Sequence, residues 1–173
     1  MNRQDDVAVP KLVCCFLNSF IIMELSMRRF VSALGTILLA IASSQTLAQM
    51  PRMELTAGFY RIEAEVAADQ ANRMQGLMHR RSMAENRGML FVFTWADRHC
   101  MWMRNTLLPL SVAFLDENGL ILNIEDMQPQ TETNHCAAGP ARFALELNLG
   151  WFNGKGIKPG NRIGGVEKSP RPQ

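Results

Sequence analysis

A group of polar side chains lying among apolar segments is the first candidate for a binding site. A guanidinium can hold a carboxylate or a phosphate through two parallel hydrogen bonds, and amide and hydroxyl groups can fix the orientation of a ligand. Arg104-Asn105-Thr106 follows an expected strand and precedes Pro109, so we expect it at a strand end, where sandwiches often display binding groups. The whole group consists of Arg73, Arg80, Arg104, Asn105, Thr106 and Glu146.

Glu146 is the member of this group whose role has two clear interpretations. Within Leu145-Glu146-Leu147 the side chains of a strand alternate, so the carboxylate points away from both leucines. A carboxylate that faces a core must be paired, and Arg73 or Arg80 is the natural partner, in a pair that only stabilises the fold. In the second interpretation it anchors a ligand. That site consists of Arg73, Arg104, Asn105 and Glu146 as polar anchors, with Trp102 and Met89 as the apolar wall.

A second group could bind copper. His99, Met101 and Met103 alternate along an expected strand and would therefore share one face. Two thioethers and an imidazole suit Cu(I), which an exported protein can meet. Methionine is also a flexible filler of apolar cores, and the sequence favours that interpretation for these residues. Copper is thus an alternative, and no other cofactor is predicted.

No catalytic set is recognisable in the sequence. The three histidines form no zinc-protease pattern, and no serine has the context of a nucleophile elbow. Asp116 and Glu117 precede Asn118-Gly119 and fit a solvated turn better than an acid–base pair. The sequence therefore favours a binding protein without catalysis over an envelope hydrolase.

The tryptophans could form a sugar-binding face, because aromatic rings stack on the apolar faces of sugars. Trp102 stands between two methionines in an expected strand, which indicates packing in the core or at its rim. Trp151 follows Gly150 and is the better surface candidate, while Trp95 is the third member of the set.

The first 48 residues differ in composition from the rest. Met27-Arg28-Arg29 precedes an apolar run of about 13 residues, and small residues follow up to Ala48. This order is typical of a secretory signal peptide, and the run is shorter than the roughly 20 residues of a membrane-spanning helix. We expect translation from Met27 rather than Met1, cleavage near Ala48, and contact with the membrane only during export. A retained anchor is the alternative.

The expected location is therefore the periplasm or the exterior of a bacterium, and the expected partner is a small ligand or an envelope protein. In an oxidising compartment the two cysteines beyond the leader, Cys100 and Cys136, favour one disulfide. The bond would close a loop of about 36 residues and contribute roughly 3–4 kcal/mol in the chain-entropy model.

Composition excludes two classes of protein. Hydrophobic residues make up 47% of the chain, and the formal net charge is +2, values that do not fit a disordered chain. Nucleic-acid-binding domains usually carry clustered Lys and Arg and a pI above about 9. The pI here is near 8.5, so no nucleic-acid partner is expected.

Short strands are the elements that must position these groups. Residues 60–66 alternate in polarity, and Asp69 can cap a short helix over 70–75 that Gly76 ends. Asn118-Gly119 predicts a hairpin between strands 110–115 and 120–124. Further strands are expected over residues 89–93, 99–105, 141–147 and 162–166, with a long loop over 128–140. This spacing predicts a sandwich or a barrel.

Several blocks of the sequence resemble the DUF192 family of uncharacterised proteins, and the likeness spans about residues 60–165. The blocks are 73–80 (RMQGLMHR), 88–91 (GMLF), 102–110 (WMRNTLLPL), 113–116 (AFLD), 127–129 (MQP), 144–147 (ALEL) and 156–160 (GIKPG). Met101 departs from the family pattern, which commonly has an aromatic residue before this tryptophan. The resemblance implies a mainly β fold: one jelly-roll-like sandwich with one or two short helices, over residues 49–173 with its core at about 58–166. It implies no activity.

Overall fold

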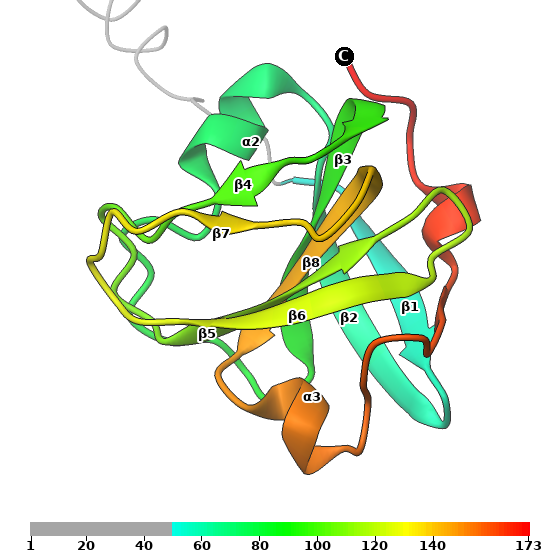
Figure 1. The fold of residues 1–173 in the computed structure, drawn as a ribbon. Coiled ribbons are helices and arrows are strands. Elements are labelled where there is room, and N and C mark those ends of the chain that lie inside the picture. The colour runs from blue at the N-terminus through cyan, green and yellow to red at the C-terminus, as the bar shows by residue number, and fades with distance from the viewer. Residues whose placement is uncertain (1–49) are drawn as a thin grey trace, which may run out of the picture. The chain divides into compact units, whose positions relative to one another are not determined.

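Seven strands form one sheet in the order β6-β5-β8-β3-β2-β1-β9, and β4 and β7 form a second, two-stranded sheet (Figure 1). The computed structural model describes residues 50–173, so the leader expected over 1–48, with its start at Met27 and its cleavage near Ala48, lies outside the described residues. The strands are β1 (Arg52–Ala57), β2 (Tyr60–Ala67), β3 (Arg87–Asp97), β4 (Cys100–Met101), β5 (Leu110–Leu115), β6 (Ile121–Met127), β7 (His135–Cys136), β8 (Ala141–Asn148) and β9 (Ile163–Gly164). The helices are α2 (Gln70–Gln75), α3 (Trp151–Gly154) and the 3-10 turn η1 (Val166–Lys168).

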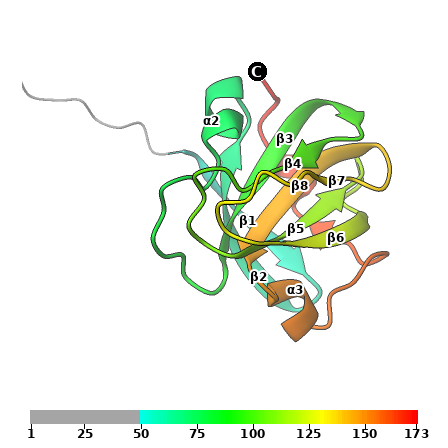
Figure 2. The ribbon, with the colours of Figure 1, turned by 60° about the vertical axis from the view of Figure 1, so that its left-hand side comes forward.

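The fold is mainly β with two short α-helices, as the sequence predicts. Neighbouring strands of the large sheet are antiparallel except β2 and β3, which run parallel. Parallel neighbours need a crossover connection, and α2 lies in the segment that provides it. Figure 2 shows α2 beside the end of β3, away from α3 at the opposite end of the sheet. None of the helices within residues 50–173 has the length and apolar character needed to cross a bilayer.

The large sheet curls until its two edges meet. Leu120, just before β6, forms a bridge with Arg162, just before β9. The Ile163 N–H donates to the Gly119 carbonyl at 2.8 Å, and the Ile121 N–H donates to the Asn161 carbonyl at 2.9 Å. These bonds turn an open sheet into a half-barrel that encloses an apolar interior.

Gly119 is required where the edges meet. Its φ is +77°, and a Cβ atom there would stand 2.3 Å from the Ile163 carbonyl oxygen. We expect Gly119→Ala to lower the free energy of unfolding by about 2–3 kcal/mol, because the left-handed backbone and the clash add together. Urea unfolding of the variant measures this loss. Gly154→Ala is the control, since a Cβ at Gly154 meets nothing within 4 Å. A loss below 0.5 kcal/mol in Gly119→Ala would contradict the closure.

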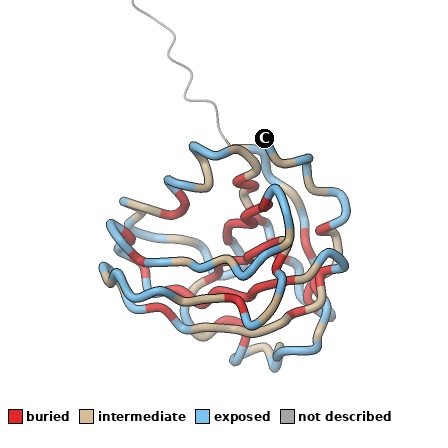
Figure 3. The backbone as a smooth tube through the Cα atoms, turned by 45° about the horizontal axis from the view of Figure 1, so that its top comes forward, coloured by how far each residue is buried: buried red, intermediate tan, exposed pale blue. Residues whose placement is uncertain are grey.

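Each face of the sheet carries a separate apolar cluster. Ile62, Ala64 and Val66 of β2 face the enclosed interior together with Leu145 and Leu147 of β8. The second cluster lies on the other face of the central strands and is covered by α2 and the β4–β7 sheet. Its members include Met89, Phe91, Met103, Val112 and Ala144. Figure 3 shows the buried backbone positions gathered along the central strands and the exposed ones along the loops.

Local signals predict several elements at their observed positions. Asp69 caps α2, where its Oδ1 accepts from the Asn72 N–H at 2.8 Å, and Gly76 ends the helix at φ +50°. The hairpin of β5 and β6 turns through Asn118-Gly119 as expected. The strand expected over 99–105 is shorter, since only Cys100 and Met101 pair. Asn105 has φ +56°, a value outside the β region, so the end of the expected strand is a turn and not a strand.

The expected disulfide is present. Cys100 of β4 and Cys136 of β7 lie opposite each other in the small sheet and are joined by an S–S bond of 2.05 Å. The Ala137 N–H also donates to the His99 carbonyl at 2.9 Å. The bond therefore fastens the loop after β6 to the segment that follows β3.

Candidate functional site

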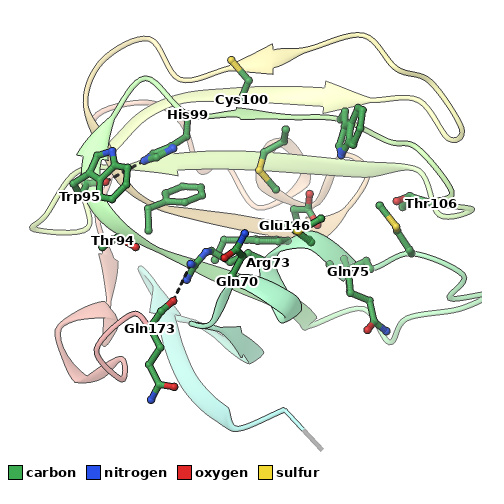
Figure 4. A pocket seen from close by; sticks show the side chains of 18 residues that line it. Gln70, Arg73, Gln75, Thr94, Trp95, His99, Cys100, Thr106, Glu146 and Gln173 are labelled. Atoms are coloured by element: carbon green, nitrogen blue, oxygen red, sulfur yellow. Dashed lines mark hydrogen bonds between the residues drawn. The ribbon is translucent and has the colours of Figure 1, made fainter.

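A pocket of about 660 Å³ lies between α2, the segment around β4, and the central strands β3 and β8. Figure 4 shows Trp95 and His99 at one end of the pocket, Thr106 at the other, and Glu146 between them. Most of its lining is aromatic or aliphatic. The lining residues are Gln70, Arg73, Met74, Gln75, Gly76, Leu77, Met78, Phe91, Phe93, Thr94, Trp95, His99, Cys100, Met101, Trp102, Thr106, Glu146 and Gln173.

Glu146 is the central polar group of the pocket. In β8 it stands between Met89 of β3 and Val112 of β5, both fully buried, and it is itself only 4% exposed. No hydrogen bond or ion pair from residues 50–173 reaches its carboxyl group. Burial without a partner raises the pKa of Glu146 to about 8, because the apolar surroundings disfavour the charged form. The carboxyl is therefore mostly protonated at neutral pH.

The alternation in Leu145-Glu146-Leu147 correctly predicts the direction of the glutamate, but the predicted arginine partner is absent. Arg80 instead makes two hydrogen bonds of 2.7 Å with Glu65 of β2. These bonds lower the pKa of Glu65, with burial opposing them. The internal ion pair between Glu146 and Arg73 or Arg80 is thus wrong, because both guanidinium groups have other acceptors.

Arg73 lines the same pocket but is occupied by backbone oxygens. Its guanidinium donates to the carbonyls of Ala68 and Val92 and to the backbone oxygen of Gln173, the last at 3.0 Å (Figure 4). Figure 4 draws Arg73 and Glu146 near each other in the pocket, but no hydrogen bond joins them, because these three backbone oxygens take up the guanidinium. The terminal segment is also held at this point, since the Gln173 N–H donates to the Ala68 carbonyl at 2.8 Å.

The other expected anchors lie elsewhere. Arg104 and Asn105 line a separate, smaller hollow of about 320 Å³ with His79, because the chain turns at the left-handed Asn105. Met89 is fully buried beneath the pocket in the second apolar cluster and does not line it. Of the six predicted ligand residues, the structure brings three together in the pocket. These are Arg73, Trp102 and Glu146.

The three expected copper ligands do not share one surface. His99 and Met101 line the pocket, whereas Met103 is fully buried in the second apolar cluster. The strand that would have aligned them ends at Met101. The His99 ring stacks on Phe93 with centroids 3.7 Å apart, and its Nε2 lies 3.0 Å from the Trp95 carbonyl. Copper binding remains an untested prediction.

The tryptophans are arranged differently from the expectation. Trp151 is only 5% exposed and packs edge-on against Phe152 and Tyr60, so it is not the surface ring. Trp95 and Trp102 are 64% and 45% exposed and stand at the pocket. The Arg104 guanidinium lies 5.7 Å from the centroid of the Trp102 ring.

The sequence interpretation missed the apolar residues that α2 contributes to the pocket. Met74 is 69% exposed on a helix with no buried residue. An apolar side chain beside Arg73 on an otherwise polar helix was the available signal. Met78, two residues after Gly76, lines the same wall.

The fold and the pocket place the protein in a class of small domains in which one sheet curls into a half-barrel and a pocket lies outside that half-barrel. The chain belongs to the DUF192 family, described as "Uncharacterized ACR", whose pattern matches residues 53–165. Among curated proteins none matches the chain.

Two crystal structures share the fold. A protein from Sinorhizobium meliloti 1021, described as a "putative transcription regulator", is 38% identical, with a TM-score of 0.62 over 66% of this chain and 92% of that one. A protein of unknown function from Novosphingobium aromaticivorans DSM 12444 is 31% identical, with a TM-score of 0.62 over 70% of this chain and 90% of that one.

Proposed function

We propose that the protein binds a small ligand with a largely apolar body in the pocket between α2, β4 and β8. The observation that carries this proposal is the buried, unpartnered Glu146 carboxyl, which opens into a pocket of about 660 Å³. Binding pockets are typically apolar clefts of this size with a few convergent polar groups. A stable fold gains nothing from an unpaired buried carboxyl, whereas a ligand can complete its hydrogen bonds.

The walls support an apolar ligand. Phe91 and Phe93 form the floor from β3, Met101 and Trp102 contribute from β4 and just beyond, and Met74 faces them from α2. Thioether side chains adapt to the shape of what they contact, which favours a ligand of irregular outline. We propose no catalysis, because Glu146 is the single acidic side chain of the pocket lining and no nucleophile–base pair accompanies it.

The signal-peptide pattern before residue 49 supports an exported protein, and we place the binding activity in the periplasm or outside the cell. An envelope partner is the second candidate, since Trp95 and Trp102 expose apolar surface at the pocket mouth. The description of the Sinorhizobium protein does not extend this proposal to DNA, because a net charge of +2 supplies little attraction for phosphates.

Nile red, a neutral apolar dye that fluoresces in apolar surroundings, tests the pocket directly. We expect a saturable rise in fluorescence with the protein and at least a tenfold loss of affinity in Met101→Trp, which fills the pocket. Leu107→Trp adds the same ring at the smaller hollow, outside this pocket, and should bind as the parent does. No saturable binding by the parent protein, or equal binding by both variants, would overturn the proposal.

A further inference from the structure

We propose that the pocket is selective for organic cations, with the ligand's ammonium group held against the Glu146 carboxylate and its apolar body against the aromatic and thioether walls. This inference rests on the proposed ligand-binding function and names the chemistry of the ligand. Primary and quaternary ammonium groups on an apolar body are the class that it predicts.

Glu146 gives the pocket one ionisable carboxyl that no basic side chain of the described residues pairs with, because Arg73 of the same lining donates to backbone oxygens. Glu146 is the only acidic residue among the lining side chains, and Met89 and Val112 flank it in the sheet. Removing one partner of a buried ion pair leaves a charge that costs several kcal/mol. Without a partner Glu146 keeps its proton and avoids this charge, and an ammonium group would supply the partner of its carboxylate.

The basic side chains of the pocket lining, and the one on the same strand, do not pair with Glu146. Arg73 of α2 donates to three backbone oxygens, those of Ala68, Val92 and Gln173. The ring of His99, just before β4, stacks on Phe93. Arg142, four residues before Glu146 in β8, does not line the pocket; its guanidinium lies 5.8 Å from the Phe143 ring centroid, and its buried Nη1 has no hydrogen-bond partner among the described residues. A ligand is thus the available source of a counter-charge.

The walls favour a cation over an anion. The face of an aromatic ring carries negative electrostatic potential and attracts ammonium groups. Phe91, Trp95 and Trp102 line the pocket, and Trp102 already has the Arg104 guanidinium 5.7 Å from its ring centroid. Aromatic rings next to a carboxylate are the arrangement that recognises ammonium ligands.

Cation binding must release a proton. In the empty pocket the carboxyl keeps its proton at neutral pH, because burial raises its pKa to about 8. When an ammonium ion binds, the O–H bond of the carboxyl breaks and its proton passes to the solvent or the buffer, leaving carboxylate against ammonium. Affinity for the cation should therefore rise up to tenfold per pH unit until the pH reaches about 8.

Three probes of nearly equal size separate the alternatives by titration calorimetry: 2-phenylethylamine, 2-phenylethanol and 3-phenylpropanoate. At pH 8.5 we expect the amine to bind at least tenfold more tightly than the alcohol, and the carboxylate most weakly. At pH 6.5 the amine should release close to one proton, measured from the enthalpies in phosphate and Tris buffers. The alcohol should release none.

Variants assign the effect to named residues. Glu146→Gln should weaken the amine at least tenfold and abolish its proton release, while the alcohol changes less than threefold. Trp102→Leu should weaken the amine more than the alcohol. Glu117→Gln removes an exposed carboxylate in the β5–β6 turn and should change neither.

Each contrary result has a distinct meaning. Equal affinity for amine and alcohol, tightest binding of the carboxylate, or no binding of the amine while Nile red still binds would overturn the cation inference and leave the pocket function standing. Failure of all three probes and of Nile red would overturn both.

Discussion

Replacing Glu146 with glutamine should make the protein markedly more stable at alkaline pH and leave it almost unchanged at pH 4.5. Burial raises the pKa of the native carboxyl from 4.5 to about 8. Below 4.5 both native and unfolded chains hold the proton, and the stability is fully present. As the pH rises toward 8, only the unfolded chain loses the proton, so stability falls. The shift corresponds to a loss of about 5 kcal/mol.

Glutamine keeps the shape of a protonated glutamate and cannot ionise. The difference in free energy of unfolding between Glu146→Gln and the parent should therefore grow between pH 4.5 and 8 and become constant above pH 8. Urea unfolding at pH 4.5, 6.5, 8 and 9 measures it, and Glu117→Gln controls for the loss of an exposed carboxylate. A difference that does not vary with pH would show that Glu146 titrates normally and has a partner or water around it.

Loss of the disulfide should have the second large effect. The Cys100–Cys136 bond closes a loop with a sequence separation of 36 residues. Replacing both cysteines with alanine should lower the free energy of unfolding by about 3–4 kcal/mol, because the unfolded chain regains the freedom of that loop. Urea unfolding of Cys100→Ala/Cys136→Ala gives the value.

The same double variant should also weaken ligand binding, since β4 forms one wall of the pocket. Without the bond, two residue pairs remain to hold β4 to β7. We expect Nile red affinity to fall severalfold, whereas Gly119→Ala, at the far edge of the large sheet, should affect stability more than affinity. A stability loss below 1 kcal/mol with unchanged dye binding would contradict a structural role for the bond.

The elements that the sequence predicts correctly are those determined by residues close together in the chain. Asp69 and Gly76 bracket α2 because their backbone and side-chain preferences act within one turn of the helix. Asn118-Gly119 predicts its hairpin for the same reason, and the alternation around Glu146 needs only the period of a strand. β1 was missed, although Met53, Leu55 and Ala57 alternate with polar residues in the same manner.

The positions of the site residues depend on the pairing of strands that are far apart in the sequence, and no local sequence pattern predicts that pairing. Glu146 is unpartnered because the β3–β8 and β5–β8 registers place Met89 and Val112 beside it. Arg104 lies outside the pocket because β4 ends at Met101 and the chain then turns at the left-handed Asn105. Residue types alone show neither this turn nor the long-range register, so they grouped six residues of which only three line the pocket.

The meeting of the sheet edges also bears on how copies of the chain behave in a crowded solution. A free strand edge offers unpaired N–H and C=O groups to another molecule, which is how sheet proteins begin to aggregate. Here the backbone at the start of β6 pairs with the segment before β9. Further along β6, the Asn123 side chain accepts from the Ala138 N–H at 2.9 Å and donates to the Cys136 carbonyl at 3.0 Å. The disulfide-bonded loop thus covers this edge of β6 and shields it from self-association.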